Sequence, residues 1–459
     1  MDTEKRTMVT GAGVEAAEEE YVRILSDPSV TGMSAEDQMS NLNEKMLAKN
    51  FTMSGKPFPT FSKPYLIDRK LRDKFIYMTR TIMEAAEKVG NLYFEDPDIK
   101  PLFEVPASDV DLVEIQPPYP RRLIVGRLDA FLNGDKLMFL EFNTDSPSGM
   151  GWHDELIRMF AELPAVKELG KKYPLTYDTF LDSFLDMLLV KYRESGGTKD
   201  NPVVAEVSND ESTIRHDVDL IVHHFKEVRG FDSFFADPRW CDYRDGKLYL
   251  NDQPVDIVHR DSIEDFTDYL DEVQPFIKAY RDGNVVMANP FCSRVGGLKC
   301  VLWLLSDEKT QHLYTEEEKK VIAETIPWTR MMRDRKSLYH GREIDLYDFV
   351  SKNKSLFVLK PNSGYGGFGV NIGRESSQSD WDASLEESKK RNYVVQEYVP
   401  ITADRFPDFE GGFSMMDKNV NINFFAFNGE FGGGFVRVSN SSIINIHQGG
   451  GLVPIFYVG

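Results

Sequence analysis

The start of the chain shows the three-to-four spacing of apolar positions that is typical of helices. One face of residues 66–89 is apolar, at Leu71, Phe75, Met78, Ile82 and Ala86. Gly90 and Asn91 follow this stretch, and the pair predicts the end of the helix. Upstream, Ser34 and Asp37 have the spacing of a capping box, which predicts a helix that runs to Lys49. We therefore expect a mainly helical N-terminal region.

The pattern changes from helices to strands at about residue 122. Two apolar runs, residues 122–132 and 137–143, flank an Asn-Gly pair at Asn133 and Gly134. Such a pair between two apolar runs is the strongest short-range signal of a β-hairpin. A helix is then expected to begin near Gly149.

The predicted hairpin gathers polar side chains on one face. Glu141 and Asn143 are two residues apart, so both leave the same face of a strand. A three-residue connection, 134–136, would place Asp129 opposite Glu141, and Arg127 would then lie opposite Asn143. Carboxylate and amide oxygens suit Mg²⁺, which favours carboxylates and substrate phosphates. The alternative is the solvent-facing polar side of a half-buried hairpin, and a register slip of one residue would separate the polar faces.

Strand and helix patterns alternate over the next hundred residues. The predicted elements are strands at residues 203–207, 256–259 and 284–288 and a helix at residues 212–229. This alternation predicts an open α/β sheet. No Gly-x-Gly-x-x-Gly turn follows a strand, so a dinucleotide-binding unit is not expected.

A glycine-rich loop follows a predicted strand at residues 356–359. Its glycines are Gly364, Gly366, Gly367 and Gly369. Such a loop lets backbone amides approach phosphates, and Lys360 at the strand end could place an ammonium group on an α- or β-phosphate. No Gly-Lys-Ser/Thr sequence follows the glycines, so this is not a Walker loop. The alternative is a glycine-rich hairpin turn with a surface lysine.

Two further segments carry candidate binding groups. A strand at residues 393–395 runs into Gln396 and Glu397, whose backbone could pair with an adenine edge, although any strand end gives this pattern. In the final β-rich stretch, residues 421–458, Arg437 could hold a γ-phosphate or a carboxylate through two hydrogen bonds. The alternative for Arg437 is an outward-facing position on an alternating strand.

The charge balance argues against two classes of partner. Lys and Arg total 54 and Asp and Glu total 74, which gives a formal net charge of −20. An acidic surface of this kind repels phosphate backbones and anionic lipids. We therefore expect no nucleic-acid partner and no membrane partner. No window approaches the ~18 apolar residues of a membrane span. The start of the chain lacks the apolar core of a signal peptide, and a cytoplasmic protein is therefore expected.

Side-chain nucleophiles and transition-metal sites are not indicated. The three cysteines, Cys241, Cys292 and Cys300, are too few and too scattered for a disulfide framework or a zinc site. The histidines form no closely spaced ligand pair, and no Gly-x-Ser-x-Gly elbow occurs. Hydrolysis by an activated serine or cysteine is therefore unsupported.

In combination, the motifs resemble those of the ATP-grasp ligases. That family normally presents a lysine, a Lys-Pro-glycine loop, a Gln-Glu hinge and a Glu-x-Asn metal pair in that order. Here Glu141 and Asn143 come before the loop and the hinge. This order resembles the circularly permuted ATP-grasp group, typified by the synthetase domain of glutathionylspermidine synthase. An Arg-x-Asp motif at Arg127 and Asp129 is also similar to that group, and the resemblance spans residues 121–459.

The resemblance implies a role for each matching residue. The implied ligands of two magnesium ions are Asp129, Glu141 and Asn143. The implied nucleotide contacts are Lys299, Lys360, Gly366, Gly367, Gln396, Glu397, Tyr398, Val399 and Arg437. Arg127 would be catalytic and stabilise the transition state, and Ser146 and Ser148 would lie near the acid substrate.

The implied fold is mixed α/β (α+β), a circularly permuted ATP-grasp with a Rossmann-like α/β subdomain and an N-terminal helical region. The implied domains are a mainly helical region at 1–120, the metal-binding hairpin and helices at 121–195, the Rossmann-like subdomain at 196–295 and the nucleotide-binding part at 296–459. The amidase domain found in some members of the group is not expected.

The implied function is an ATP-dependent carboxylate–amine ligase. It would form an amide or peptide bond through an acyl phosphate and release ADP and phosphate, with ATP and two Mg²⁺ ions. The expected partners are a small-molecule carboxylate and an amine, and a homodimer is a possible assembly. No side-chain nucleophile is required, which agrees with the lack of an activated serine or cysteine in the sequence. Two alternatives stay open: a small-molecule kinase of the same fold, and a nucleotide-binding scaffold without turnover.

Overall fold

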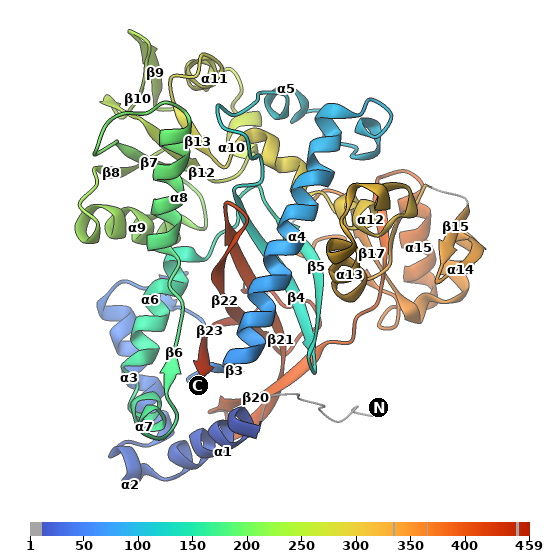
Figure 1. Ribbon diagram of the computed structural model, residues 1–459. Helices are drawn as coiled ribbons and strands as arrows, with labels where there is room; N and C mark the ends of the chain where they lie inside the picture. Colours follow the sequence, from blue (N-terminus) through green and yellow to red (C-terminus); the bar gives the residue numbers. More distant parts are fainter. Residues whose placement is uncertain (1–11, 334–335, 365, 447–448) are drawn as a thin grey trace.

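The computed structural model describes residues 12–333, 336–364, 366–446 and 449–459 (Figure 1). Its largest sheet has eight strands: β3 (Tyr65–Asp68), β4 (Val125–Asn133), β5 (Lys136–Asn143), β6 (Leu175–Thr176), β20 (Thr402–Asp408), β21 (Ser414–Phe427), β22 (Glu430–Ser439) and β23 (Gly451–Val458). The main path runs β3-β23-β22-β21-β4-β5, while β20 pairs with β21 and β6 with β23. All neighbours are antiparallel except β3 and β23, which are parallel. The fold is a mixture of helix and sheet, as predicted.

The hairpin of β4 and β5 reaches the predicted pairing by an unexpected route. Its turn has two residues, Gly134 and Asp135, where three were expected. A bulge at Leu140 then shifts the register by one residue. Asp129 therefore pairs with Glu141 beyond the bulge, as predicted. The shorter turn and the bulge offset each other, so the polar residues pair as predicted.

The two faces of the large sheet are buried in separate apolar clusters. Along β21, Phe424 and Ala426 belong to one cluster, and Phe425 and Phe427 belong to the other. This division follows from the alternation of side chains along a strand. One face is covered by α4 (Arg69–Glu95) and α13 (Glu316–Thr325), and α12 (Cys300–Ser306) packs against α4. The other is covered by α1 (Ala12–Ser26), α3 (Ala35–Ala48), α6 (Met150–Ala161), α7 (Pro164–Lys172) and α8 (Leu181–Glu194).

Helix α4 differs at both ends from the helix expected at residues 66–89. The first of those residues belong to β3, and Asp68 caps the helix by accepting a hydrogen bond from a backbone amide of its first turn. The helix also continues through Gly90, which was expected to end it. Beyond the glycine, Tyr93 is 3% exposed, so packing outweighs the low helix propensity of glycine.

The remaining helices of the N-terminal half are short. They are α2 (Pro28–Thr31), the 3₁₀ turn η1 (Lys100–Leu102) and α5 (Val110–Val113). The capping box of Ser34 and Asp37 is present at the start of α3, as predicted, and the helix ends at Ala48. A small hairpin pairs β1 (Thr52–Met53) with β2 (Lys56–Pro57). None of the helices in the described ranges combines the length and the apolar character that a membrane crossing requires.

A second sheet forms the predicted open α/β unit. Its four parallel strands have the order β13-β12-β7-β8. They are β7 (Val204–Val207), β8 (Ser233–Ala236), β12 (Ile257–Arg260) and β13 (Val286–Ala288). The helices of this unit are α9 (Arg215–His223), its π-helical continuation η2 (His224–Val228), α10 (Glu264–Thr267) and α11 (Gln274–Arg281). A three-stranded sheet of β9 (Cys241–Arg244), β10 (Lys247–Leu250) and β11 (Gln253–Pro254) adjoins it.

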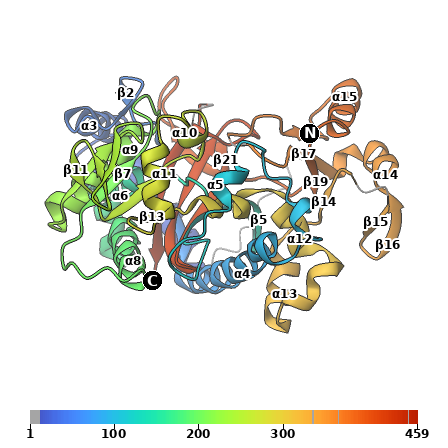
Figure 2. The same cartoon turned by 90° about the horizontal axis from the view of Figure 1, so that it is seen from above.

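A third unit carries the glycine-rich loop. Its antiparallel strands are β14 (Thr329–Met331), β17 (Phe357–Pro361), β18 (Asn371–Ile372) and β19 (Tyr393–Glu397), in the order β14-β19-β17-β18. They share an apolar core with α14 (Leu346–Lys352), α15 (Gln378–Ser388) and the hairpin of β15 (Lys336–Tyr339) and β16 (Arg342–Asp345). The 3₁₀ segments η3 (Phe291–Gly297), η4 (Glu308–Leu313) and η5 (Lys354–Leu356) complete this half of the chain. Seen from above, this unit and the parallel sheet flank the large sheet on opposite sides (Figure 2).

Candidate active site

A cleft of about 870 Å³ opens between the hairpin, the parallel sheet and the unit with the glycine-rich loop. The predicted site residues that line it are Arg127, Asp129, Glu141, Asn143, Ser146, Ser148, Lys360, Gly366, Gly367, Gln396, Glu397, Tyr398, Val399 and Arg437. Lys299 adjoins the cleft through its ion pair with Glu141. The fold therefore brings all the predicted site residues together, although their roles stay predictions.

Asp129 is the centre of a buried polar network on the hairpin. Its carboxylate accepts hydrogen bonds from Arg127 Nε, Asn143 Nδ2 and Arg437 Nη1, each at 3.1 Å. Arg437 reaches it from β22, across the intervening strand β21. Asp129 is 7% exposed and Arg127 8% exposed, so these charges interact with little screening by water.

Glu141 links the hairpin to the glycine-rich loop. Lys299 Nζ lies 2.9 Å from Glu141 Oε1 and donates at the same distance to the backbone oxygen of Gly364. Burial alone would raise the pKa of Glu141, yet the ammonium groups of Lys299 and Lys360 outweigh it and hold the pKa below its usual value. Glu141 is therefore an ionised carboxylate at neutral pH.

Lys360 lies at the end of β17 and points into the same network. Its ammonium group donates to Gln396 Oε1 at 2.7 Å and to the backbone oxygen of Leu140 at 3.1 Å. The bulge in β5 thus supplies one of its acceptors. Burial lowers the pKa of Lys360 from 10.5 to about 8. Its ammonium form is therefore less stable than in water, and an anion in the cleft would stabilise it.

One side of the cleft, here called the basic wall, consists of Arg127, Lys299, Lys360 and Arg437. Burial, and after it the charge of Arg127, lowers the pKa of Arg437 from 12.5 to about 10. These four cations face the two carboxylates of Asp129 and Glu141, which leaves two positive charges on this wall. The chain as a whole has a formal net charge of −20, so the basic wall is a local exception. It would attract a phosphorylated anion.

The glycines of the loop are needed for their backbone conformation. Gly364, Gly366 and Gly367 have φ angles of 136°, 70° and 78°, a region that favours glycine. A Cβ atom on Gly369 would lie 2.7 Å from the Pro361 side chain, too close for any other residue. The loop therefore has a shape that brings backbone groups to the cleft, as predicted for a phosphate-binding loop. Tyr365, within the same loop, lies outside the described residues.

The strand end at β19 offers fewer free backbone donors than expected. The amide of Glu397 donates to the backbone oxygen of Trp328 at 2.8 Å, and the amide of Tyr398 donates to Leu356 at 2.7 Å. Both amides already have acceptors within the protein. An adenine at this strand end would therefore be recognised by other groups of the segment, which still lines the cleft with Gln396 and Val399.

Ser146 and Ser148 lie between the hairpin and α6. The backbone oxygen of Ser148 accepts a hydrogen bond from Arg127 Nη1 at 2.8 Å, which ties this segment to the basic wall. Gly149 then begins α6 with a φ of 112°, which confirms the helix start that was expected there. The carboxylate of Asp217 accepts from the Gly149 amide at 2.6 Å and so holds the helix start against α9.

The donor set on the hairpin fits a magnesium ion. Asp129 and Glu141 supply two carboxylates, and Asn143 uses its amide nitrogen on Asp129, which leaves its oxygen as an acceptor. Within the described ranges, no group of three or more His, Cys, Asp or Glu side chains could hold a metal by itself. That composition agrees with Mg²⁺, which is commonly held by one or two carboxylates together with substrate phosphates.

A second group of charged residues in the lining of the cleft, here called the acidic wall, consists of Glu211, Asp261, Glu264, Asp265 and Asp268. Sequence reasoning did not assign these residues to the site. Burial, followed by the charges of Asp265 and Asp145, raises the pKa of Asp261 well above its usual value. The available signal was their position just after the predicted strands of the α/β sheet, where ligand sites of such sheets lie.

No protein-family model matches the chain. An uncharacterized protein of Mycobacterium leprae is 24% identical over 366 residues, and one of Mycobacterium tuberculosis is 25% identical over 370 residues. Each match covers 74% of this chain and about three fifths of the relative, 60% and 61%. Among solved structures, a glutathione synthetase-like effector of Globodera pallida has a TM-score of 0.61 at 12% identity, covering 94% of this chain and 98% of that one.

The fold is ATP-grasp-like. At 12% identity, the likeness to the effector shows the fold and nothing finer. The circular permutation inferred from the order of the motifs stays a prediction. An ATP-grasp-like fold can carry different chemistry, so function has to be argued from the cleft.

Proposed function

We propose that the protein is an ATP-dependent carboxylate–amine ligase. The observation that carries the proposal is the basic wall, where four cations and the two carboxylates of Asp129 and Glu141 meet beside the glycine-rich loop. A triphosphate is the anion that best suits so much buried positive charge next to a glycine-rich loop. A small carboxylate and an amine are the proposed partners of the nucleotide.

The reaction divides into two transfers. The carboxylate of the acid forms a bond to the γ-phosphorus of ATP, the bond to the leaving oxygen breaks, and ADP departs with the electron pair. The amine then forms the C–N bond of the product and displaces phosphate from the acyl phosphate. Neither step needs a side-chain nucleophile; the protein has to position the reactants and stabilise charge.

Each charged group of the basic wall has a proposed task in the first transfer. Lys299 and Lys360 hold phosphate oxygens below the glycine-rich loop. Arg127 and Arg437 present fixed guanidinium groups where charge grows on the transferring phosphoryl group and on the carbonyl oxygen. Their hydrogen bonds to Asp129 keep both groups in place before the substrates arrive.

Asp129, Glu141 and Asn143 are the proposed holders of magnesium. When bound, the metal neutralises phosphate charge and polarises the phosphoryl oxygen. The three side chains share one face of the hairpin because of its register, and Lys299 keeps Glu141 ionised.

The cysteines give no support to a covalent mechanism. Burial raises the pKa of Cys292 to about 12 and raises the pKa of Cys300 still further. A thiol must ionise to act as a nucleophile, so both groups are inert at neutral pH. The absence of activated thiols at these two positions agrees with direct phosphoryl transfer.

A screen of ADP release tests the proposal. The protein is incubated with ATP, Mg²⁺ and pairs of small carboxylates and amines, drawn from amino acids, short peptides and polyamines. A ligase releases ADP only when both an acid and an amine are present, with one amide formed for each ADP. Release without an amine would indicate a kinase, and no release with any pair would indicate a scaffold.

A further inference from the structure

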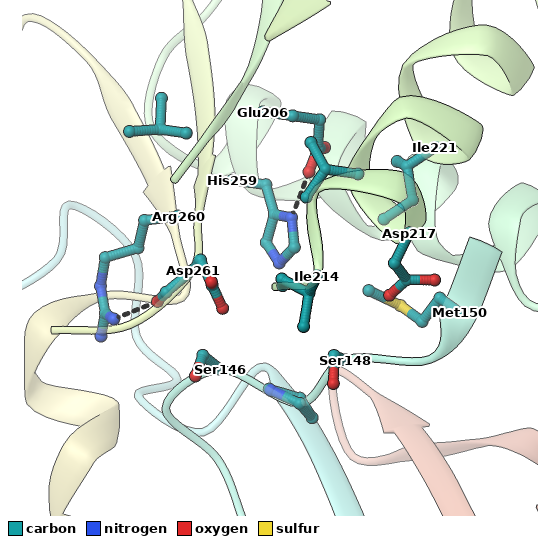
Figure 3. Close-up of a pocket in the computed structure, with 13 residues that line it drawn as sticks. Ser146, Ser148, Met150, Glu206, Ile214, Asp217, Ile221, His259, Arg260 and Asp261 are labelled. Atoms are coloured by element: carbon teal, nitrogen blue, oxygen red, sulfur yellow. Dashed lines mark hydrogen bonds and ion pairs between the residues drawn. The ribbon is translucent and has the colours of Figure 1, made fainter. Parts of the chain in front are cut away.

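A second, smaller pocket opens beside the main cleft (Figure 3). Its volume is about 20 Å³, enough for one group of the size of a water molecule. Ser146, Ser148, Ile214 and Asp261 line both cavities, so the small pocket is a recess in the wall of the cleft. A substrate group the size of an amino group would fit it.

The pocket lies at a position that open α/β sheets use for ligands. In the order β13-β12-β7-β8, strand β8 follows β7 on one side, and β12 lies on the other. The chain therefore reverses its direction of winding between β7 and β12. Ligands of such sheets bind at the carboxyl ends of the strands at this reversal. The pocket is lined by Glu206 and Val207 of β7 and by His259 and Arg260 of β12, at those ends.

A histidine and a glutamate form a buried pair across these two strands. Glu206 and His259 are direct partners in the register of β7 and β12, and His259 Nδ1 lies 2.6 Å from Glu206 Oε2. Glu206 is 1% exposed and His259 8% exposed. A carboxylate only accepts hydrogen bonds, so Nδ1 donates to Glu206, and in the uncharged imidazole Nε2 then carries the lone pair that a base needs. The Phe184 ring packs edge-on against the imidazole and fixes its plane.

The free nitrogen of His259 is directed into the pocket. Figure 3 shows the imidazole between Asp261 and Ile214, with its far edge toward Ser146 and Ser148. The backbone oxygen of Ser148 is bound by Arg127. The stretch of chain with Ser146 and Ser148, which lines the pocket, therefore also contacts the guanidinium of the basic wall. An acyl phosphate beside Arg127 and an amine in the pocket would meet at this stretch.

The other charged groups that face the pocket already have structural partners. Asp217 accepts hydrogen bonds from the amides at the start of α6, and burial raises its pKa to about 6. Arg260 forms an ion pair with Asp145 at 2.5 Å, and its Nη1 donates to the backbone oxygen of Asp261. The carboxyl of Asp261 accepts a hydrogen bond from Ser212 Oγ at 3.5 Å, and burial and neighbouring carboxylates raise its pKa well above the usual value. Of the charged and titratable groups around the pocket, His259 is the one with a basic nitrogen directed into it.

We propose that His259 is the general base that accepts the proton of the amine, and that Glu206 positions it. The inference rests on the proposed ligase function. The lone pair of the uncharged amine forms the C–N bond, the C–O bond to phosphate breaks, and phosphate leaves with the electron pair. The proton released from nitrogen passes to Nε2 of His259 and from there to phosphate or solvent. Nδ1 keeps its proton on Glu206 throughout.

The test separates amide formation from acyl-phosphate formation. The probe is hydroxylamine, which is uncharged at neutral pH and captures an acyl phosphate as a hydroxamate without help from a base. The acid is the carboxylate that gives the most ADP release with the wild-type protein. His259→Asn should lower amide formation by about 10²-fold or more, while hydroxamate formation stays within about threefold of wild type. His224→Asn is the matched control, because His224 is also buried and paired with a carboxylate, Asp182, but lines neither cavity.

A second variant examines the positioning role of Glu206. Glu206→Gln keeps an acceptor for Nδ1 but removes the negative charge that stabilises the protonated imidazole. The acid limb of the rate profile for amide formation should therefore move to lower pH, whereas a purely structural role would leave the limb in place. Equal losses of amide and hydroxamate in His259→Asn, or an amide rate within about threefold of wild type, would overturn the base role. If wild-type protein forms neither product with any acid, the ligase proposal fails first, and the base role fails with it.

Discussion

The two walls of the cleft carry opposite charge and differ in how the chain builds them. On the basic wall, Arg127, Lys360 and Arg437 lie on strands, and each is held by a hydrogen bond to a group of the protein. The acidic wall lies in the segments after β7 and β12, as shown by Asp261 and Asp265. There, burial and neighbouring carboxylates raise the pKa of Asp265 to about 6.

The difference indicates which wall has its charged groups preorganised before substrates bind. Strand register fixes Arg127 and Arg437 relative to each other, and the carboxylates of Asp129 and Glu141 compensate part of the charge of the basic wall. Such preorganisation is what charge stabilisation in a transition state requires. On the acidic wall, Arg294 pairs with Glu264, but burial and neighbouring carboxylates still raise the pKa values of Asp261 and Asp265. We therefore expect substitutions on the basic wall to affect rate, and those on the acidic wall to affect stability.

The largest effect is expected for Glu141→Gln. The change removes a charged ligand from the proposed magnesium site and the partner of Lys299, so ADP release should fall by about 10³-fold or more. Asn143→Ala should act in the same direction. The measurement is the steady-state rate of ADP release at saturating ATP and Mg²⁺, beside thermal unfolding of each variant.

Glu430→Gln provides the control for that comparison. Glu430 also lies on the large sheet, but its side chain is 66% exposed and pairs with Arg80 at the surface. Its variant should keep the wild-type rate. Normal turnover in Glu141→Gln, with an unchanged melting temperature, would show that the polar face of the hairpin is structural.

The next effect in size is expected for Arg127→Lys. Lysine keeps the charge but loses the planar guanidinium that binds Asp129 and the Ser148 oxygen together. The maximal rate should fall by about 10²–10³-fold with little change in the Michaelis constants. Single-turnover kinetics give the rate of the chemical step. Arg80→Lys, at an exposed position, is the control, and a rate within about threefold of wild type in Arg127→Lys would contradict the role.

Lys360→Ala should weaken ATP binding more than it affects the fold. Loss of a charge-assisted contact to phosphate corresponds to a fall in affinity of about 10–100-fold. Isothermal titration with a non-hydrolysable ATP analogue and Mg²⁺ measures it. Lys352→Ala is a suitable control, because Lys352 belongs to the same unit but pairs with Asp348 on the surface. Equal affinities of Lys360→Ala and wild type would remove Lys360 from the nucleotide site.

The smallest effect is expected on the acidic wall, for Asp265→Asn. The folded state raises the pKa of this carboxyl from 3.8 to about 6, mainly through burial, so ionisation destabilises the fold. The destabilisation is absent below pH 4 and complete above pH 6. The variant should therefore raise the free energy of unfolding by about 1–2 kcal/mol at pH 7.5 and by nothing at pH 4. Urea unfolding at both pH values measures this difference.

Asp200→Asn is the control for the pH comparison, since the Asp200 side chain is fully exposed. It should not change the difference between the two pH values. A stability gain in Asp265→Asn that is equal at pH 4 and pH 7.5 would mean that charge repulsion is not its cause. A large fall in ADP release in this variant would contradict the expectation that substitutions on the acidic wall affect stability and not rate.

Sequence reasoning recovered what local pattern can encode. The Asn-Gly turn and the two-residue alternation placed Asp129 opposite Glu141, although the turn length was wrong and the bulge at Leu140 was not visible. Turn length depends on a few backbone angles, whereas the polar face is set by the requirement that apolar side chains face the core. The helix through Gly90 shows the opposite case, because core packing outweighed a local stop signal.

The residues that sequence reasoning missed come together only through tertiary structure. Glu206 and His259 are 53 residues apart in sequence and meet because β7 and β12 are neighbours in the parallel sheet. Neither belongs to a recognisable motif. The residues of the acidic wall were also missed. In a sequence, a charged residue after a strand is ordinarily a solvated loop residue, and only the tertiary structure brings these residues to the cleft. Pairing of non-adjacent strands is the information that a single sequence does not supply.

Transfer of oxygen from the acid to phosphate tests the central claim most directly. The acid selected by the ADP-release screen is labelled with ¹⁸O in its carboxylate, and the inorganic phosphate is analysed by mass spectrometry after the reaction with ATP and the amine. Formation and aminolysis of an acyl phosphate predict one ¹⁸O atom in phosphate for each amide formed. Phosphate without ¹⁸O, or label retained in a phosphorylated product with no amide, would contradict the ligase account.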